Sequence, residues 1–444
     1  KEAELIKDPK ELEVRAIFKA RADALSEKLK DVPAALAADK AAAEKKVADL
    51  KAANAPADEI AAAEKALAAV PKDAEAAKKA WTAQRTGATN RSNQLANMPR
   101  HGQQFAGDPA GDEKARTAFD TSRRNFLALI FCLMVGTAAL PHILMRYYTT
   151  PSVKQARESV TWSLFFIFLL YFTAPALAVL VKYEVFTVLV GTPFDKLPAW
   201  ITAWAKVDAA LLSVADINKD GILQLAEMTI GGDIIVLATP EIGGLPYVIS
   251  GMVAAGGMAA ALSTADGLLL TIANALSHDL YYKMLDPNAP ASRRVLVSKI
   301  LLVVVALAAA YVAAQKPADI LFLVGAAFSF AAAAFFPPLV LGIFWKRATK
   351  AGACVGMILG LGITVYYMIM TQPWLRGVFN ITSPVELWYG IQPISAGIFG
   401  VPLGVAAIIL VSLVTPAPRQ DIQELVDHVR YPTLRGDTLN TEAT

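Results

Sequence analysis

Residues 126–148, FLALIFCLMVGTAALPHILMRYY, are long and apolar enough for a membrane-crossing helix, yet the run contains two interruptions. Gly136 lowers the helix propensity, and Pro141 removes a backbone hydrogen-bond donor. Inside a bilayer, such a break requires neighbouring protein or a water-filled cavity to satisfy the freed carbonyl groups. The stretch therefore predicts a discontinuous helix of the kind that forms transporter binding sites. A simple proline kink packed against neighbouring helices is the open alternative.

Further apolar runs follow the first one. Together they predict seven spans, at residues 124–145, 160–183, 245–278, 294–314, 318–344, 351–371 and 391–414. The chain of 444 residues is 55% hydrophobic, which is too apolar for an ordinary soluble protein of this length. We therefore expect an all-α integral membrane protein.

Charged residues gather ahead of the first span. Residues 1–120 carry 21 of the 42 Lys and Arg residues and 20 of the 39 Asp and Glu residues. We expect an Ala/Lys/Glu-rich helical insertion outside the membrane at 1–85, a polar linker at 86–120, a transmembrane domain at 121–415 and a tail at 416–444. The insertion is predicted to be either a solvated spacer or an arm that binds a partner.

The short connections between spans predict the orientation. Residues 146–157, 279–299 and 345–350 are rich in Lys and Arg, whereas the alternate connections at 315–317 and 372–390 are poor in them. By the positive-inside rule the rich connections are cytoplasmic. We expect a bacterial inner (plasma) membrane protein with its N-terminal insertion outside and its tail inside.

The connection between the second and third spans contains DINKDGILQLAE, residues 216–227, which fits the calcium loop of an EF-hand. The expected calcium ligands are Asp216, Asn218, Asp220, the Ile222 carbonyl and Glu227, with Gly221 at the turn. The glycines that follow the loop prevent a long exit helix, so we expect a single, weak calcium site. A chance acidic loop is the alternative.

The third span contains AALSTADGLLLTIANALSHDLY, residues 260–281, in which Ser263, Thr264 and Asp266 interrupt an apolar helix. Two adjacent hydroxyls and the Ala260 carbonyl one turn earlier are hard oxygen ligands that suit sodium. Hydroxyls in membrane helices also bond their own backbone or join helices, so that alternative stays open. The predicted substrate path comprises Gly136, Thr137, Pro141, His142 and Asp266.

Three stretches resemble the sodium/solute symporter family, and their amino-acid sequences are most similar to the cation/acetate symporter branch. They are GTAALPHILMRYYTTPSVKQARESVTW at 136–162, STADGLLLTIANALSHDLYYK at 263–283 and FPPLVLGIFWKRATKAGACVGMILG at 336–360. The resemblance implies the second half of a five-plus-five inverted-repeat (LeuT-type) bundle that works by alternating access. It also implies sodium (Na⁺) binding at Ala260, Ser263 and Thr264, with the remaining ligands on a first core helix. On this reading the chain is a C-terminal portion, and the N-terminal half of the same transporter is missing.

The sequence thus predicts cation-coupled symport of a small organic acid such as acetate across the lipid bilayer. It contains no nucleophile elbow, phosphate-binding glycine loop or Cys/His metal cluster, so we expect no enzyme, and no basic aromatic patch predicts nucleic-acid binding. The alternatives are a membrane sensor or receptor on the same scaffold, a proton-coupled transporter, and a calcium-binding adhesion or structural protein.

Overall fold

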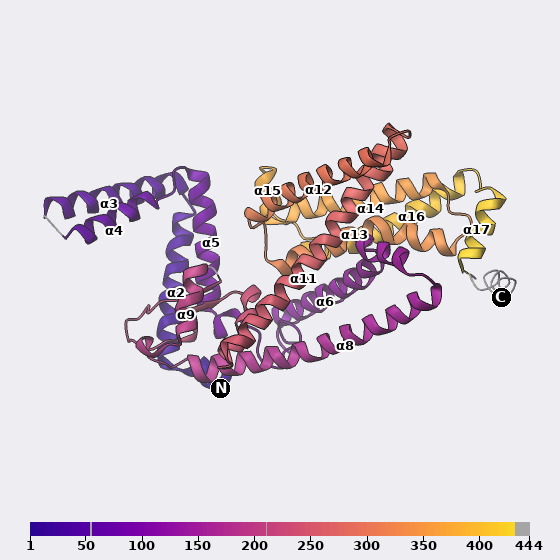
Figure 1. Cartoon of the computed structure of the whole chain (residues 1–444). Helices are drawn as coiled ribbons and strands as arrows, with labels where there is room; N and C mark the ends of the chain where they lie inside the picture. Colours follow the sequence, from indigo (N-terminus) through magenta and orange to yellow (C-terminus); the bar gives the residue numbers. More distant parts are fainter. Residues whose placement is uncertain (54–55, 210, 431–444) are drawn as a thin grey trace. The chain divides into compact units, whose positions relative to one another are not determined.

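A computed structural model describes residues 1–53, 56–209 and 211–430 (Figure 1). Within this range, seven helices are long and apolar enough to cross a membrane, which confirms the predicted number of spans. They occupy Glu113–Tyr147, Val153–Leu189, Tyr247–Leu285, Ala291–Ala314, Ile320–Phe344, Lys350–Thr371 and Pro393–Val414. The chain is thus a helical membrane protein. Part of the predicted tail, residues 431–444, lies outside the described residues.

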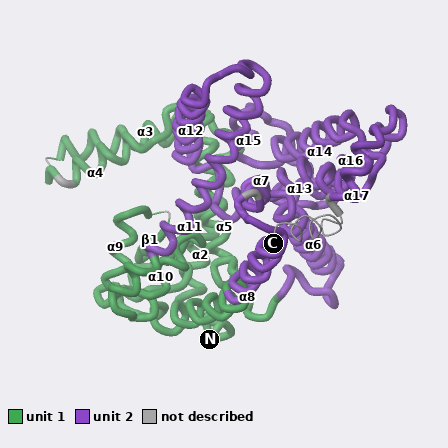
Figure 2. The backbone as a smooth tube through the Cα atoms, turned by 45° about the vertical axis from the view of Figure 1, so that its right-hand side comes forward, with its two compact units in different colours: residues 1–103, 170–253 green, residues 104–169, 254–444 purple. Residues whose placement is uncertain are grey.

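The chain forms two compact units, each built from two separate segments (Figure 2). Unit 1 comprises residues 1–103 and 170–253, and unit 2 comprises residues 104–169 and 254–444. The expected insertion at 1–85 therefore folds in one unit with the connection that carries the loop 216–227.

Unit 1 contains the polar helices of the insertion. Its elements are α1 (Glu2–Lys7), α2 (Pro9–Lys28), α3 (Val32–Ala52), α4 (Ala57–Ala68), α5 (Ala74–Ser92), α9 (Ala199–Val207), α10 (Ile235–Ile242) and the strands β1 (Leu212–Val214) and β2 (Met228–Ile230). Helices α2 and α5 lie side by side, and α3 and α4 form a hairpin next to them (Figure 1). Phe18 of α2 and Ala88 of α5 are buried in one small core together with Ala226 of the loop 216–227.

The strands hold the ends of that loop together. β1 and β2 pair in antiparallel register, with Ser213 opposite Thr229. Leu223, inside the loop, donates its N–H to the Thr192 carbonyl at 2.9 Å and accepts a hydrogen bond from the Gly191 N–H at 2.8 Å. The loop is thus attached to a third backbone segment, and its apolar side chains join a core with Ile201 and Ile234.

Unit 2 contains most of the spans. Its helices are α6 (Glu113–Ala139), α7 (Pro141–Leu144), α12 (Ala291–Ala314), α13 (Ile320–Phe344), α14 (Lys350–Thr371), α15 (Pro373–Val378), α16 (Gly397–Val414) and α17 (Gln420–Arg430). Two helices cross from one unit to the other: α8 (Val153–Glu184) and α11 (Tyr247–Asn274), which continues as a π-helix over Ala275–Leu285.

The helices α13, α14 and α16 pack closely because small residues let their backbones approach. A Cβ atom on Gly360 of α14 would lie 2.6 Å from the Ala333 carbonyl oxygen and 3.0 Å from the Gly400 carbonyl oxygen. α6 packs against α13 in the same way, since a Cβ atom on Gly136 would lie 2.5 Å from the Phe328 carbonyl oxygen. These close approaches are typical of helix packing in membranes.

Candidate functional site

The break predicted in the first span lies at Leu140 and Pro141. α6 ends at Ala139, Leu140 has extended backbone angles (φ −67°, ψ 117°), and α7 begins with Pro141 at its first position. Proline fits there because the first residue of a helix needs no N–H partner. The helix runs through Gly136 without interruption, so Gly136 serves close packing against Phe328 and does not cause the break.

The position of the break bears on two predicted substrate-path residues, Gly136 and Thr137. Gly136 is buried, and a larger side chain there would collide with the backbone of α13. Its neighbour Thr137 is exposed and donates its hydroxyl to the Leu133 carbonyl at 2.7 Å. Only Thr137 of this pair therefore presents a side chain that could line a path.

The break lies against the helix that carries the predicted sodium ligands. A Cβ atom added to Gly267 of α11 would lie 3.2 Å from Nη2 of Arg146 and 3.8 Å from Cβ of His142. Nδ1 of His142 is buried and has no hydrogen-bond partner among the described residues. The structure thus brings an imidazole and a guanidinium from the residues after the break to one glycine on α11, two groups that can bind a carboxylate together.

Two of the three predicted sodium ligands also lie together. The Thr264 hydroxyl donates to the Ala260 carbonyl at 3.1 Å on the same helix, one turn apart. Ser263 lies beside them and is exposed, as are Ala260 and Thr264. The described residues do not enclose these oxygen atoms, so the sodium assignment remains a prediction.

Asp266 is likewise exposed on α11. Among the described residues, none forms a hydrogen bond or an ion pair with its carboxylate. One turn later, Thr271 donates its hydroxyl to the Gly267 carbonyl at 2.7 Å and so satisfies its own backbone. α11 therefore offers one carboxylate and one pair of hydroxyls that the described fold leaves accessible.

The loop 216–227 behaves in the opposite way, because its carboxylates bind the chain itself. Glu227 is fully buried, and its carboxylate accepts hydrogen bonds from the N–H groups of Ile217 at 2.6 Å and Gln224 at 3.1 Å. Asp216 accepts a hydrogen bond from the Gly221 N–H at 3.0 Å. Gly221 has a φ of +72°, which explains the glycine at the turn.

The insertion helix α2 supplies two more partners to this loop. Glu11, only 3% exposed, accepts hydrogen bonds from the N–H groups of Leu225 at 2.9 Å and Ala226 at 3.1 Å. The ammonium of Lys10 lies 2.7 Å from Oδ2 of Asp220. α2 therefore docks on the loop through one buried carboxylate and one partly exposed ion pair.

Burial and charge shift the pKa values of these groups. Burial raises the pKa of Glu11 to about 7, against the lowering effect of its two backbone hydrogen bonds. Burial also raises the pKa of Glu227. Burial would raise the pKa of Asp220 too, but the hydrogen bonds from Lys10, Ile222 and Gln224, together with the charge of Lys10, outweigh burial and lower this pKa.

The calcium prediction is not supported. Among the described residues, no group of three or more His, Cys, Asp or Glu side chains is arranged to hold a metal ion. Glu227 binds backbone N–H groups at both of its oxygens, and Asp220 pairs with the cation of Lys10. The sequence pattern matched the ligand types but could not reveal that the fold uses these oxygens itself.

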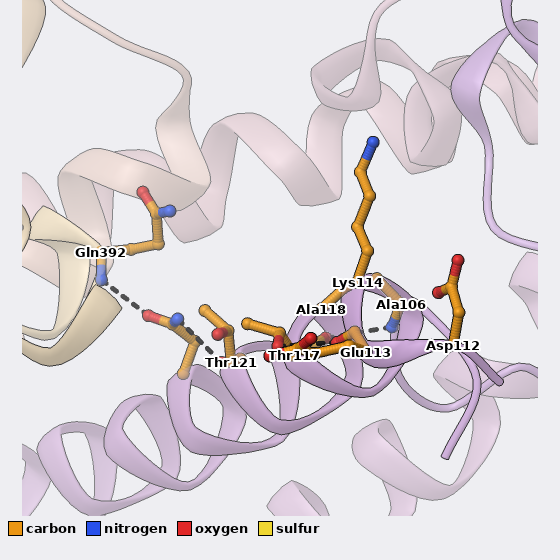
Figure 3. A pocket seen from close by; sticks show the side chains of 10 residues that line it. Ala106, Asp112, Glu113, Lys114, Thr117, Ala118, Thr121 and Gln392 are labelled. Atoms are coloured by element: carbon orange, nitrogen blue, oxygen red, sulfur yellow. Dashed lines mark hydrogen bonds between the residues drawn. The ribbon is translucent and has the colours of Figure 1, made fainter. Parts of the chain in front are cut away.

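A large open hollow lies elsewhere in unit 2, along the first turns of α6 (Figure 3). It has a volume of about 1000 Å³, and its lining includes Asp112, Lys114 and Gln392. The Gln392 N–H donates to the Asn125 side chain at 2.6 Å on its wall. None of the predicted sodium or substrate residues lines it, so it is not the predicted transport site.

Sequence reasoning did not select three residues that the structure places at these sites. Arg146 falls in the basic connection 146–157 and in the stretch that resembles the family, but it was given no role at the site, although it lies only four residues after His142. Gly267 follows Asp266 directly and could have suggested a close approach. Glu11 carried no signal, because its partner is 214 residues away in sequence.

The chain is similar to known proteins. Residues 234–360 match the family model described as the sodium:solute symporter family, which confirms the resemblance noted above. An uncharacterized symporter of Cupriavidus necator is 50% identical over 431 residues, covering 97% of this chain and 61% of that protein. A monocarboxylic acid transporter of Corynebacterium glutamicum is 28% identical over 289 residues, covering 65% of this chain and 46% of that protein.

The chain thus spans less than two thirds of the length of these relatives. No solved structure matches it. The two relatives carry the names of a symporter and of a monocarboxylic acid transporter.

Proposed function

Because this chain belongs to the sodium:solute symporter family, we propose that it contributes to the sodium-coupled uptake of a small monocarboxylic acid such as acetate. The observation that carries the proposal is the position of α11. One helix bears the Ala260, Ser263 and Thr264 oxygens and, one turn later, the Gly267 contact with His142 and Arg146. Sodium and a carboxylate would then bind to neighbouring parts of one element, which suits coupled transport.

The proposed cation site is incomplete in the described residues. The Ala260 carbonyl and the hydroxyls of Ser263 and Thr264 supply three neutral oxygen atoms, which suits a monovalent cation better than a divalent one. The remaining ligands would come from protein outside the described residues. Binding of sodium would compete with the hydrogen bond from Thr264 to Ala260 only weakly, because the carbonyl oxygen has a second lone pair.

The proposed anion site rests on His142 and Arg146. A guanidinium can donate two parallel hydrogen bonds to one carboxylate, and the buried Nδ1 of His142 needs a partner. Gly267 leaves room beside both groups because it has no side chain. The name of the monocarboxylic acid transporter among the relatives supports a substrate of this class.

The test is uptake of labelled acetate by the whole natural protein in proteoliposomes, measured against the sodium concentration. In Ser263→Ala combined with Thr264→Ala, we expect the sodium half-saturation to rise at least about tenfold, about 1.4 kcal/mol of binding free energy. Thr271→Ala is the matched control, since it removes a hydroxyl from the same helix that bonds only to the Gly267 carbonyl.

An unchanged sodium half-saturation in the double variant would reject the sodium site. If uptake depends on a proton gradient and not on sodium, the coupling ion is the proton and not sodium. Uptake of no monocarboxylate under either gradient would remove the substrate assignment.

A further inference from the structure

The short helix α17 differs from the spans that precede it. Its apolar residues Ile422, Leu425 and Val426 recur at the spacing of one helical face, with acidic residues on the opposite side. Ile422 is 47% exposed and Leu425 is 55% exposed. Both side chains therefore lack a covering partner within the part of the chain that the structure describes.

The chain fixes the start of α17 close to the end of a span. α16 ends at Val414, six residues before α17 begins. The guanidinium of Arg347 donates to the Thr415 carbonyl at 2.7 Å, and the hydroxyls of Thr349 and Thr415 lie 2.9 Å apart. These contacts hold the connection at the level where α13 ends and α14 begins.

The polar side of α17 contacts the rest of the protein through an ion pair. Asp427 forms an ion pair of 2.7 Å with Lys346, which lies two residues after the end of α13. On a helix, Asp427 projects away from the face shared by Ile422, Leu425 and Val426. The apolar face is thus turned away from the end of α13.

We propose that α17 lies in the interface of the lipid bilayer, with Ile422, Leu425 and Val426 inserted among the lipids. The position of α17 indicates that lipid covers this apolar face. α17 begins beside the end of a membrane span, and Lys346, its ion-pair partner, adjoins Trp345. Tryptophan and lysine at the end of a span mark the level of the lipid headgroups. A helix with one apolar face at that level buries this face among the upper parts of the acyl chains.

The charge of α17 predicts which lipids it needs. The polar face carries Asp421, Glu424 and Asp427. Arg419 pairs with Asp421 and Lys346 pairs with Asp427, which leaves no excess of positive charge among these five groups, so attraction to anionic lipids does not drive the contact. Insertion should therefore occur in phosphatidylcholine vesicles alone and should not strengthen when phosphatidylglycerol is added. This behaviour differs from that of basic interfacial helices.

Spin labels on the whole protein in vesicles test this placement. Leu425→Cys carries the label on the apolar face, and Glu424→Cys carries it on the polar face as the matched control. Both are made with Cys354→Ser, since Cys354 is exposed and Cys132 is buried. In vesicles of phosphatidylcholine, we expect oxygen to relax the label at position 425 at least about threefold more than a water-soluble nickel complex does, with the reverse order at position 424.

Three outcomes are distinguishable. Lipid-like accessibility at position 425 with water-like accessibility at position 424 supports the proposal. Water-like accessibility at both positions would overturn it, because the apolar face would then lie in solvent. Low accessibility of position 425 to both reagents would also overturn it, because a protein surface would then cover this face.

Discussion

Two stretches of this chain carry ligand patterns for cations, and the fold treats them in opposite ways. In the loop 216–227, Glu227 is fully buried and bonded to backbone N–H groups, and Asp220 is paired with Lys10. On α11, Ser263, Thr264 and Asp266 are all exposed. The loop's oxygens hold the protein together, whereas those of α11 remain accessible to a ligand. A ligand pattern therefore predicts a cation only where the fold does not use the same oxygen atoms.

The largest expected effect is a difference in unfolding free energy when one carboxylate is removed from each of the two stretches. Glu227→Ala leaves the N–H groups of Ile217 and Gln224 unpaired in a buried place, at about 1–3 kcal/mol each. We expect unit 1 to lose about 3 kcal/mol or more of unfolding free energy, whereas Asp266→Ala changes it by less than about 0.5 kcal/mol. Thermal unfolding and amide hydrogen exchange measure both. Equal losses in the two variants would contradict the comparison.

The second effect is a pH dependence of the contact between α2 and the loop. Burial raises the pKa of Glu11 from its ordinary value of 4.5 to about 7, so the folded state binds the proton more tightly than the unfolded state. The stabilisation is complete below pH 4.5 and is lost as the pH rises to about 7, a change of about 3 kcal/mol. Glu227 acts in the same direction, because its pKa is also raised.

Hydrogen exchange of the Leu225 and Ala226 amides, corrected for the intrinsic rate, reports this contact directly. Their protection should fall between pH 5 and pH 8. In Glu11→Gln the fall should be smaller, because the side chain at position 11 then no longer ionises. The charges of Asp8 and Arg15 also act on the pKa of Glu11, and both residues are unchanged in this variant. Protection that is constant with pH in the unaltered protein would refute the role of Glu11.

The third effect is smaller and concerns the anion site next to α11. In Gly267→Ala, the added Cβ would lie 3.2 Å from Nη2 of Arg146, so the guanidinium must move by a few tenths of an ångström. We expect the KM for acetate to rise about threefold to tenfold, a loss of about 0.6–1.4 kcal/mol. Gly256→Ala is the control, because a Cβ there meets nothing within 4 Å. An unaltered KM in Gly267→Ala would show that the substrate does not bind beside Gly267 of α11.

The sequence predicted those features that depend on local pattern. The seven spans followed from apolar length, and the break at Pro141 followed from proline chemistry. It did not predict the close packing of Gly136 on Phe328 or the docking of Glu11 on Leu225, because both depend on residues far apart in sequence. The environments of Glu227 and Asp266 also escaped sequence reasoning, since burial is decided by packing and not by residue type.

The smallest expected effect is that of calcium on thermal stability. It decides whether the oxygen atoms of the loop 216–227 serve only the fold or also bind a ligand. A single EF-hand-type site with a Kd of about 10⁻⁴ to 10⁻³ M would stabilise the folded protein by about 1.4–2.7 kcal/mol in 10 mM calcium. Such a gain would raise the midpoint of thermal unfolding by several degrees. We expect a rise of less than about 1 °C, equal to that in 10 mM magnesium, because Glu227 is occupied by backbone N–H groups and Asp220 by Lys10. Asp216→Ala controls for binding elsewhere. A rise of several degrees that calcium alone produces, and that Asp216→Ala abolishes, would show that the loop opens to bind the metal and would return it to the ligand-binding class.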